Sequence, residues 1–168
     1  MRVGWVSSGL IQGEVPPAGE PLEVVRIHIV PSAGRVRRER LPDGQWRIDA
    51  GTLPVDRLPG APPVTTALVI RALVEILREE RLQVLTSDHD APPAAAAMAG
   101  VPFVMAFPAD RHPGHILRAL DPFRGWAAVV VGSEAHLRVL RRLGVDAVEW
   151  IAPGARREWL ELYRRILT

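Results

Sequence analysis

Three residue types are absent from the sequence: cysteine, lysine and asparagine. Without cysteine the chain can form neither disulfides nor thiolate metal sites. All 21 basic side chains are arginine, and the sequence pI of about 10.2 reflects the high pKa of arginine. Because the formal net charge is only +2, the composition gives little support for nucleic-acid binding, and we expect no nucleic-acid partner.

Long apolar runs are also missing. No stretch approaches the roughly 18 apolar residues of a membrane span, and the first residues, Met1 to Val3, enter a strand pattern instead of a signal peptide. With 168 residues, 48% of them hydrophobic and 24% charged, the chain is the right size for one globular domain. We therefore expect a single cytoplasmic domain.

The most informative stretch runs from Leu82 to Phe107. An apolar strand pattern at 82–86 ends in the polar turn Ser87-Asp88-His89-Asp90. A helix pattern then runs from Pro92 to Ala99, and Gly100 stands where a helix ends with positive φ. Val101 to Phe107 is a second apolar strand, so the stretch predicts a βαβ unit with parallel strands. Ligands bind at the carboxyl ends of such strands, which is where the polar turn would lie.

Hydrophobic periodicity predicts the remaining elements. Strands are expected at Arg2–Ser7, Leu22–Val30, Trp126–Val131 and Val145–Ala152, and an edge hairpin at 35–40 and 45–50 around the turn Leu41-Pro42-Asp43-Gly44. Helices are expected from a cap at Thr65 or Thr66 to Glu80, weakly at Ile116–Leu120, from a cap at Ser133 to Gly144, and at Arg156–Leu167. The prolines between Glu14 and Pro21 leave the first crossover helix missing or very short.

These elements together predict an α/β fold. We expect a single Rossmann-like domain, with a mostly parallel sheet, an edge β-hairpin, helices on both faces and a C-terminal helix packed back on the domain. The domain would span residues 1–154, and residues 155–168 would form the docking helix.

Two features of the first strands allow more than one interpretation. The arginines at 35–40 either protect a solvated sheet edge or form a patch for phosphate and for peripheral contact with an anionic membrane; Glu39 and Asp49 dilute their charge and favour the first interpretation. By the period of two, His28 is expected to be an exposed partner of a neighbouring strand and not a ligand.

The chemistry-bearing residues follow strand ends. The loop after the first strand, beginning Ser8-Gly9, lacks the G-x-G-x-x-G spacing, so it is either a simple turn or a backbone cradle for phosphate or sugar. Ser7-Ser8-Gly9 is also no G-x-S-x-G elbow, which argues against a serine hydrolase. The carboxylates and imidazoles of Asp88, His89, Asp90, His112 and His115 are of the types that bind zinc or manganese. The same groups hydrogen-bond sugar hydroxyls well, and we expect no metal and no cofactor.

Two segments carry a family resemblance. SDHDAPPAAAAMAGVPFVMAF and WAAVVVGSEAHLRVLRRLGVDAVEWIAPGA resemble the N-terminal Rossmann-like domain of family 4 glycosyltransferases, the retaining enzymes of GT-B fold, and most closely the phosphatidylinositol mannosyltransferases. That family has an H-x-H-[DE]-P turn, strands ending in T-x-H and V-S-E, and I-P-N-G-V-D at the hinge. The resemblance covers residues 82–155 well and 1–63 only loosely.

Three departures from the family pattern change what the resemblance implies. The family's histidine that contacts the donor sugar falls on Pro108, and the hinge asparagine is absent from Ile151-Ala152-Pro153-Gly154. The family's C-terminal donor-binding domain has no counterpart. In its place REWLELYRRIL, within 156–168, resembles the final helix that returns to the first domain.

The resemblance therefore implies the acceptor-binding half of a glycosyltransferase, inactive alone and without catalytic residues of its own. The implied ligand is a sugar or phosphate-bearing acceptor, and the implied contacts are Ser8 and Gly9 through backbone N–H groups, His89 and Asp90 through hydrogen bonds, Arg111 through charge, and Ser133 at a helix N-terminus. Two alternatives stay open: a subunit that works with a separate donor-binding chain or as a homodimer, and a stand-alone or engineered structural domain without a ligand.

Overall fold

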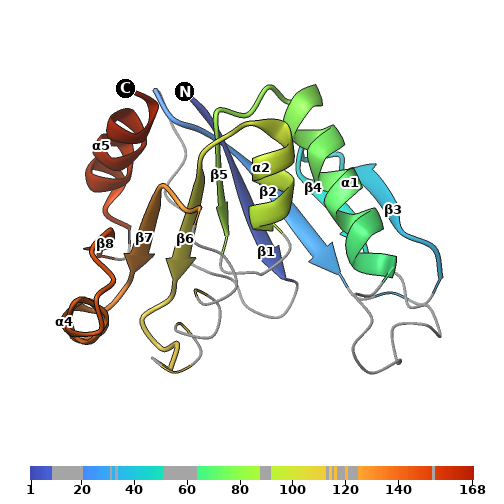
Figure 1. Cartoon of the computed structure of the whole chain (residues 1–168). Coiled ribbons are helices and arrows are strands. Elements are labelled where there is room, and N and C mark those ends of the chain that lie inside the picture. Colours follow the sequence, from blue (N-terminus) through green and yellow to red (C-terminus); the bar gives the residue numbers. More distant parts are fainter. Residues whose placement is uncertain are drawn as a thin grey trace.

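The computed structural model describes residues 1–8, 21–30, 32, 34–50, 64–87, 92–112, 114, 116, 120, 125–152 and 154–168. These residues form one sheet with helices on both of its faces (Figure 1). The strands are β1 (Arg2–Ser8), β2 (Glu23–Val30), β3 (Arg37–Arg40), β4 (Trp46–Asp49), β5 (Val84–Ser87), β6 (Phe103–Phe107), β7 (Ala128–Val131) and β8 (Val148–Trp150). The helices within the described ranges are α1 (Val64–Glu79), α2 (Pro92–Ala99), α4 (Glu134–Arg142) and α5 (Arg156–Leu167).

The sheet has eight strands in the order β3-β4-β2-β1-β5-β6-β7-β8. Every neighbouring pair is parallel except β3 and β4, which form an antiparallel hairpin at one edge. The expected α/β class, mostly parallel sheet and edge hairpin are therefore confirmed. The chain places β2 on one side of the central strand β1 and, after α1, places β5 on the other side. The strand order thus reverses between β1 and β5, and in open α/β sheets a crevice for ligands lies at such a reversal.

Alternate side chains of each strand enter two separate cores. On one face, apolar residues such as Ile27, Leu85 and Met105 pack beneath α1, α2 and α4. On the other face, Val3, Trp5, Val84, Val104 and Val130 pack against α5. Figure 1 shows α1 and α2 in front of the sheet and α5 at its side. The prediction of helices on both faces is confirmed.

Helix α5 docks through aromatic rings. The Trp159 ring meets the Trp5 ring edge-on with centroids 5.4 Å apart, and Tyr163 lies beside Trp159 at 5.5 Å. The Tyr163 hydroxyl and Thr86 Oγ1 are 3.0 Å apart and fully buried. Burial raises the pKa of Tyr163 above its ordinary value, so the hydroxyl remains protonated and able to donate. The amphipathic pattern that the sequence shows at 156–167 is satisfied by this face of the sheet.

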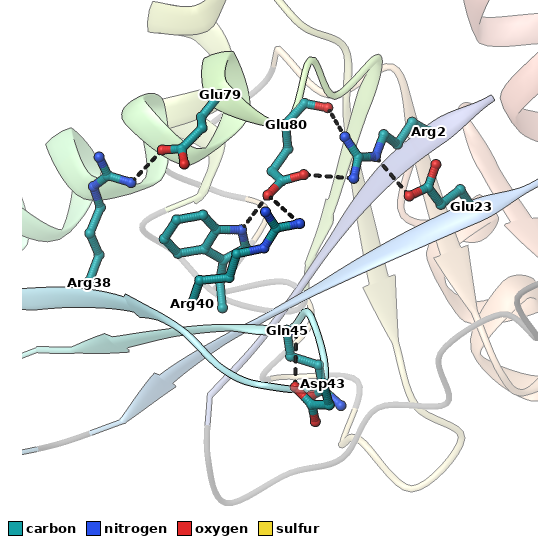
Figure 2. A network of polar contacts seen from close by, with 9 residues as sticks. Arg2, Glu23, Arg38, Arg40, Asp43, Gln45, Glu79 and Glu80 are labelled. Carbon is teal, nitrogen blue, oxygen red and sulfur yellow. Dashed lines mark hydrogen bonds and ion pairs between the residues drawn. The ribbon is translucent and has the colours of Figure 1, made fainter.

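A buried carboxylate joins four elements at the amino ends of the strands. Glu80, directly after α1, pairs with Arg2 of β1 at 2.7 Å and with Arg40 of β3 at 3.3 Å. Its Oε1 also accepts a hydrogen bond of 2.9 Å from the indole nitrogen of Trp46 at the start of β4. Figure 2 shows the Glu80 carboxylate between Arg2 and Arg40, with dashed lines to both. Since a buried charge needs partners on every side, this network ties α1 to the edge hairpin and to the central strand.

Some expected boundaries are wrong. Helix α1 begins at Val64, so Thr65 and Thr66 are its second and third residues and neither is the N-cap. Ser87 belongs to β5 and is fully buried, so the polar turn starts one residue later than predicted. In contrast, helix α5 has the predicted bounds, and Gly100 has the predicted positive φ, of 70°.

Candidate functional site

The carboxyl ends of the parallel strands meet at one edge of the sheet. Ser8 ends β1, Ser87 ends β5, Phe107 ends β6 and Val131 ends β7. The order reversal between β1 and β5 lies at this edge, since Val6 and Ser87 are register partners. A small molecule that binds as ligands do in open α/β sheets would therefore meet the segments that follow these strands.

The predicted binding residues are distributed around this edge. Ser8 is the last residue of β1, although its side chain is not among those described. Gly9, His89 and Asp90 lie outside the described residues. Arg111 is half-buried in the turn after β6, where its backbone nitrogen donates to the Pro108 carbonyl at 3.1 Å.

Ser133 directly precedes α4 in extended conformation, with φ −128° and ψ 130°. This is the predicted N-cap position, and the Ser133 carbonyl accepts the first helical bond from the Leu137 nitrogen at 3.2 Å. The prediction that the Ser133 side chain caps the helix is wrong, because this side chain makes no capping hydrogen bond. Its hydroxyl is not used in closing the helix and stands at the positive end of the helix dipole.

A pocket opens between α5 and the carboxyl ends of β6 and β7. It holds about 390 Å³ of empty space, open solvent included, and none of the described residues that line it is charged. The lining residues are Trp5, Ala106, Phe107, Pro108, Ala109, Val130, Gly132, Ile151, Ala152, Gly154 and Trp159. At Gly132 a Cβ atom would lie 2.9 Å from the Ala109 nitrogen, so glycine is needed for the turn after β6 to close against β7.

A polar chain that sequence reasoning missed lies on the same face as α5. Ser7 Oγ is 3.0 Å from His28 Nδ1, and His28 Nε2 is 2.6 Å from Gln45 Oε1. Ser7 is 7% exposed, and His28 and Gln45 are half-buried. The three residues come from β1, β2 and the turn before β4, so only the tertiary fold brings them together.

The expectation for His28 is partly right. It does pair with a neighbouring strand, because Ser7 and His28 are register partners between β1 and β2. It is half-buried, however, and not exposed as the sequence pattern indicated. The signal that could have revealed these hydrogen bonds is the register between β1 and β2. That register follows only once the two strands are known to be adjacent and parallel.

Charged groups elsewhere have structural partners. Arg38 pairs with Glu75 at 3.0 Å and with Glu79 at 2.7 Å, both on α1, and the hydrogen bond that Arg38 donates to Glu79 is the largest cause of the raised pKa of Arg38. Arg40 pairs with Glu80. These contacts hold the hairpin against α1, which favours the interpretation of a protected edge over that of an anion patch.

The described residues also bear on metal binding and on membrane insertion. No group of three His, Asp or Glu residues in them could hold a metal ion. Of the five side chains considered for a metal, His112 alone lies in these ranges, and its Nδ1 accepts a hydrogen bond of 3.1 Å from the Gly114 nitrogen. No helix among the same residues has the length and apolar character needed to cross a membrane.

Comparison with known proteins gives no assignment. No protein-family model matches the chain, and a search of the curated proteins finds no match.

Proposed function

We propose that this protein is a Rossmann-like domain that acts as the acceptor-binding half of a glycosyltransferase. The observation that carries the proposal is the pocket between α5 and the ends of β6 and β7. The sequence resemblance assigns the family's donor-sugar contact to position 108 and the family's returning helix to residues 156–168. Pro108 and Trp159 of that helix both line this one pocket.

The chemistry at the carboxyl edge suits a polar acceptor. Arg111 provides a positive charge and Ser133 a hydroxyl at a helix N-terminus, which together favour a phosphate group. The described residues that line the pocket are aromatic or uncharged, which suits the face of a sugar ring. Because Pro108 cannot donate a hydrogen bond from its side chain, we expect this chain to bind an acceptor but not to transfer a sugar on its own.

Thermal unfolding in the presence of ligands tests the proposal. We expect an inositol phosphate at about ten times its Kd to stabilise the native state by about 1.4 kcal/mol. For a chain of this size that free energy raises the Tm by roughly 3–6 °C. GDP-mannose and UDP-glucose should leave the Tm unchanged. Arg111→Ala should remove the shift, because it removes the charge next to the phosphate.

Arg142→Ala is the matched control, since it removes an equal charge from the opposite end of α4. It should keep the full shift. A Tm shift with a sugar nucleotide alone would contradict the acceptor assignment. A shift that survives Arg111→Ala would place the phosphate elsewhere, and no shift with any inositol phosphate would reject the binding function.

One observation favours a second candidate, a subunit that works with a partner chain. Trp150 on the edge strand β8 is 47% exposed, next to the pocket residues Ile151 and Ala152. The unpaired backbone groups of an edge strand can pair with another chain. If the partner is a second copy, light scattering of the purified chain gives twice its mass of 18.5 kDa, and Trp150→Ser returns the single-chain mass. A single-chain mass before substitution argues against the homodimer.

A further inference from the structure

The hydrogen-bonded chain from Ser7 through His28 to Gln45 has the arrangement of a nucleophile, a base and an orienting group. Gln45 Oε1 can only accept a hydrogen bond, so His28 Nε2 carries the proton in the 2.6 Å contact. In the neutral imidazole His28 Nδ1 is then an acceptor, and Ser7 Oγ–H donates to it across 3.0 Å. The Ser7 hydroxyl is thus bonded to a base with the correct tautomer.

We propose that Ser7 is a nucleophile activated by His28 and that it attacks acyl esters. The proposal is independent of acceptor binding by Arg111 and Ser133. The missing G-x-S-x-G elbow, which argued against a serine hydrolase in the sequence, does not decide the matter. Serine nucleophiles are recognised by the geometry of their partners and occur on unrelated folds.

The position of Ser7 and His28 in the fold supports the role of Ser7 as a nucleophile. Ser7 is the next-to-last residue of β1, at the carboxyl edge and beside the strand-order reversal. It is 7% exposed, and its partner His28 is half-buried. A histidine that is hydrogen-bonded to a serine, at the edge where open α/β sheets bind ligands, is suited to activate that serine.

The reaction proceeds in two balanced steps. Ser7 Oγ bonds to the acyl carbon while its proton passes to His28 Nδ1, and the bond from the acyl carbon to the leaving oxygen breaks as that oxygen takes the proton. Water then attacks the Ser7 ester and gives its proton to His28, and Ser7 Oγ recovers the proton as the acid leaves. Gln45 is a positioning residue, because it holds the imidazole without touching the ester.

Arg26 gives the site a preference for anionic substrates. It lies two residues before His28 on β2, and alternate residues of a strand share a face. Its register partner on β1 is Trp5, two residues before Ser7. An ester whose acyl group ends in a carboxylate can therefore pair with the exposed Arg26 while its carbonyl meets Ser7.

Hydrolysis of p-nitrophenyl acetate and p-nitrophenyl hemisuccinate by the full chain tests the proposal. We expect turnover above the solvent rate, faster for the hemisuccinate, and an acyl group on Ser7 in peptides analysed by mass spectrometry. Ser7→Ala should reduce the rate to background, and His28→Ala should lower it by about 10² to 10⁴-fold. His112→Ala, which removes an exposed histidine elsewhere, is the control and should leave the rate unchanged.

A second variant separates this role from a structural one. Gln45→Glu places a carboxylate on His28 Nε2, which stabilises the imidazolium formed during attack, so the rate should rise by roughly five- to tenfold. Gln45→Leu should lower it. If the hydrogen bond between Gln45 and His28 were only structural, Gln45→Glu would not raise the rate and Gln45→Leu would not lower it. The circular dichroism of both variants reports any unfolding separately.

Three results would overturn the proposal. Turnover that survives Ser7→Ala means that another group attacks the ester. An acyl group found on another residue, with none on Ser7, rules out Ser7 as the nucleophile. Absence of turnover and of acylation in the unchanged chain, with native circular dichroism, rejects the activity altogether.

Discussion

Replacing Glu80 by alanine should lower the free energy of unfolding by about 3 kcal/mol, because the substitution leaves two arginines and an indole without their shared partner. The side chain is 4% exposed and contacts Arg2, Arg40 and Trp46. Arg2 and Arg40 are 32% and 54% exposed, so water recovers part of their solvation and keeps the loss below that of a fully buried pair. Urea unfolding of both proteins measures the difference.

Glu79→Ala is the matched control for this loss. Glu79 is the neighbouring carboxylate on α1, 48% exposed, and it also pairs with an arginine, Arg38, at 2.7 Å. Because exposed ion pairs contribute little, we expect a loss of about 0.5 kcal/mol or less. Glu80→Gln should fall between the two, since it keeps an acceptor for the Trp46 indole but loses the charge. Equal losses for Glu79→Ala and Glu80→Ala would contradict the role given to the buried carboxylate.

Trp159→Ala should have the largest effect on stability, about 3–5 kcal/mol, because it removes the ring that fills the space between α5 and the sheet. Trp159 is 5% exposed and packs on both Trp5 and Tyr163. Loss of the ring enlarges the adjacent pocket, and it also weakens the docking of the whole helix. Denaturant unfolding followed by circular dichroism gives the magnitude.

Two further substitutions on α5 show whether docking depends on this face alone. Leu167→Ala changes a residue that is 39% exposed and should cost about 1 kcal/mol or less. Tyr163→Phe keeps the ring but leaves Thr86 Oγ1 without its partner, for a loss of about 1–3 kcal/mol. If Trp159→Ala costs no more than Leu167→Ala, the helix is not held by the face assigned to it.

Much of the fold is readable from the sequence because local signals agree with the tertiary structure. The hairpin turn at 41–44, the glycine at position 100 and the amphipathic stripe of α5 each specify local geometry that the fold keeps. Element ends are less well specified. Thr65 and Thr66 look like helix caps, yet α1 already begins at Val64.

The polar networks could not be predicted, because they depend on which strands become neighbours. In the sequence Glu80 is only the last residue of an expected helix, and its burial depends on Arg2, Arg40 and Trp46, which the sheet brings to it. Ser7 and His28 carry no motif and are separated by 20 intervening residues, since the pair differs by 21 positions. Parallel pairing of β1 and β2 in one register makes them partners.

The sequence predicts where the candidate site lies better than it predicts the contacts within it. Polar residues after strand ends pointed to the carboxyl edge, and the fold places Arg111 and Ser133 there. The pocket beside them is lined by Trp5 and Trp159, which in the sequence belong to the apolar patterns of the first strand and the last helix. Buried aromatic side chains have the same pattern whether they fill a core or also wall a pocket, so sequence alone does not separate the two roles.

The most direct test of acceptor binding at the carboxyl edge is a titration of ¹⁵N-labelled protein with an inositol phosphate, followed by NMR. We expect the largest amide shift changes in the turn after β6, around Arg111, and at Ser133 and the first turn of α4, with little change at the hairpin of β3 and β4. Changes centred on the arginines of that hairpin would contradict the assignment and place anion binding at the sheet edge instead. Unchanged spectra at millimolar ligand would contradict acceptor binding itself.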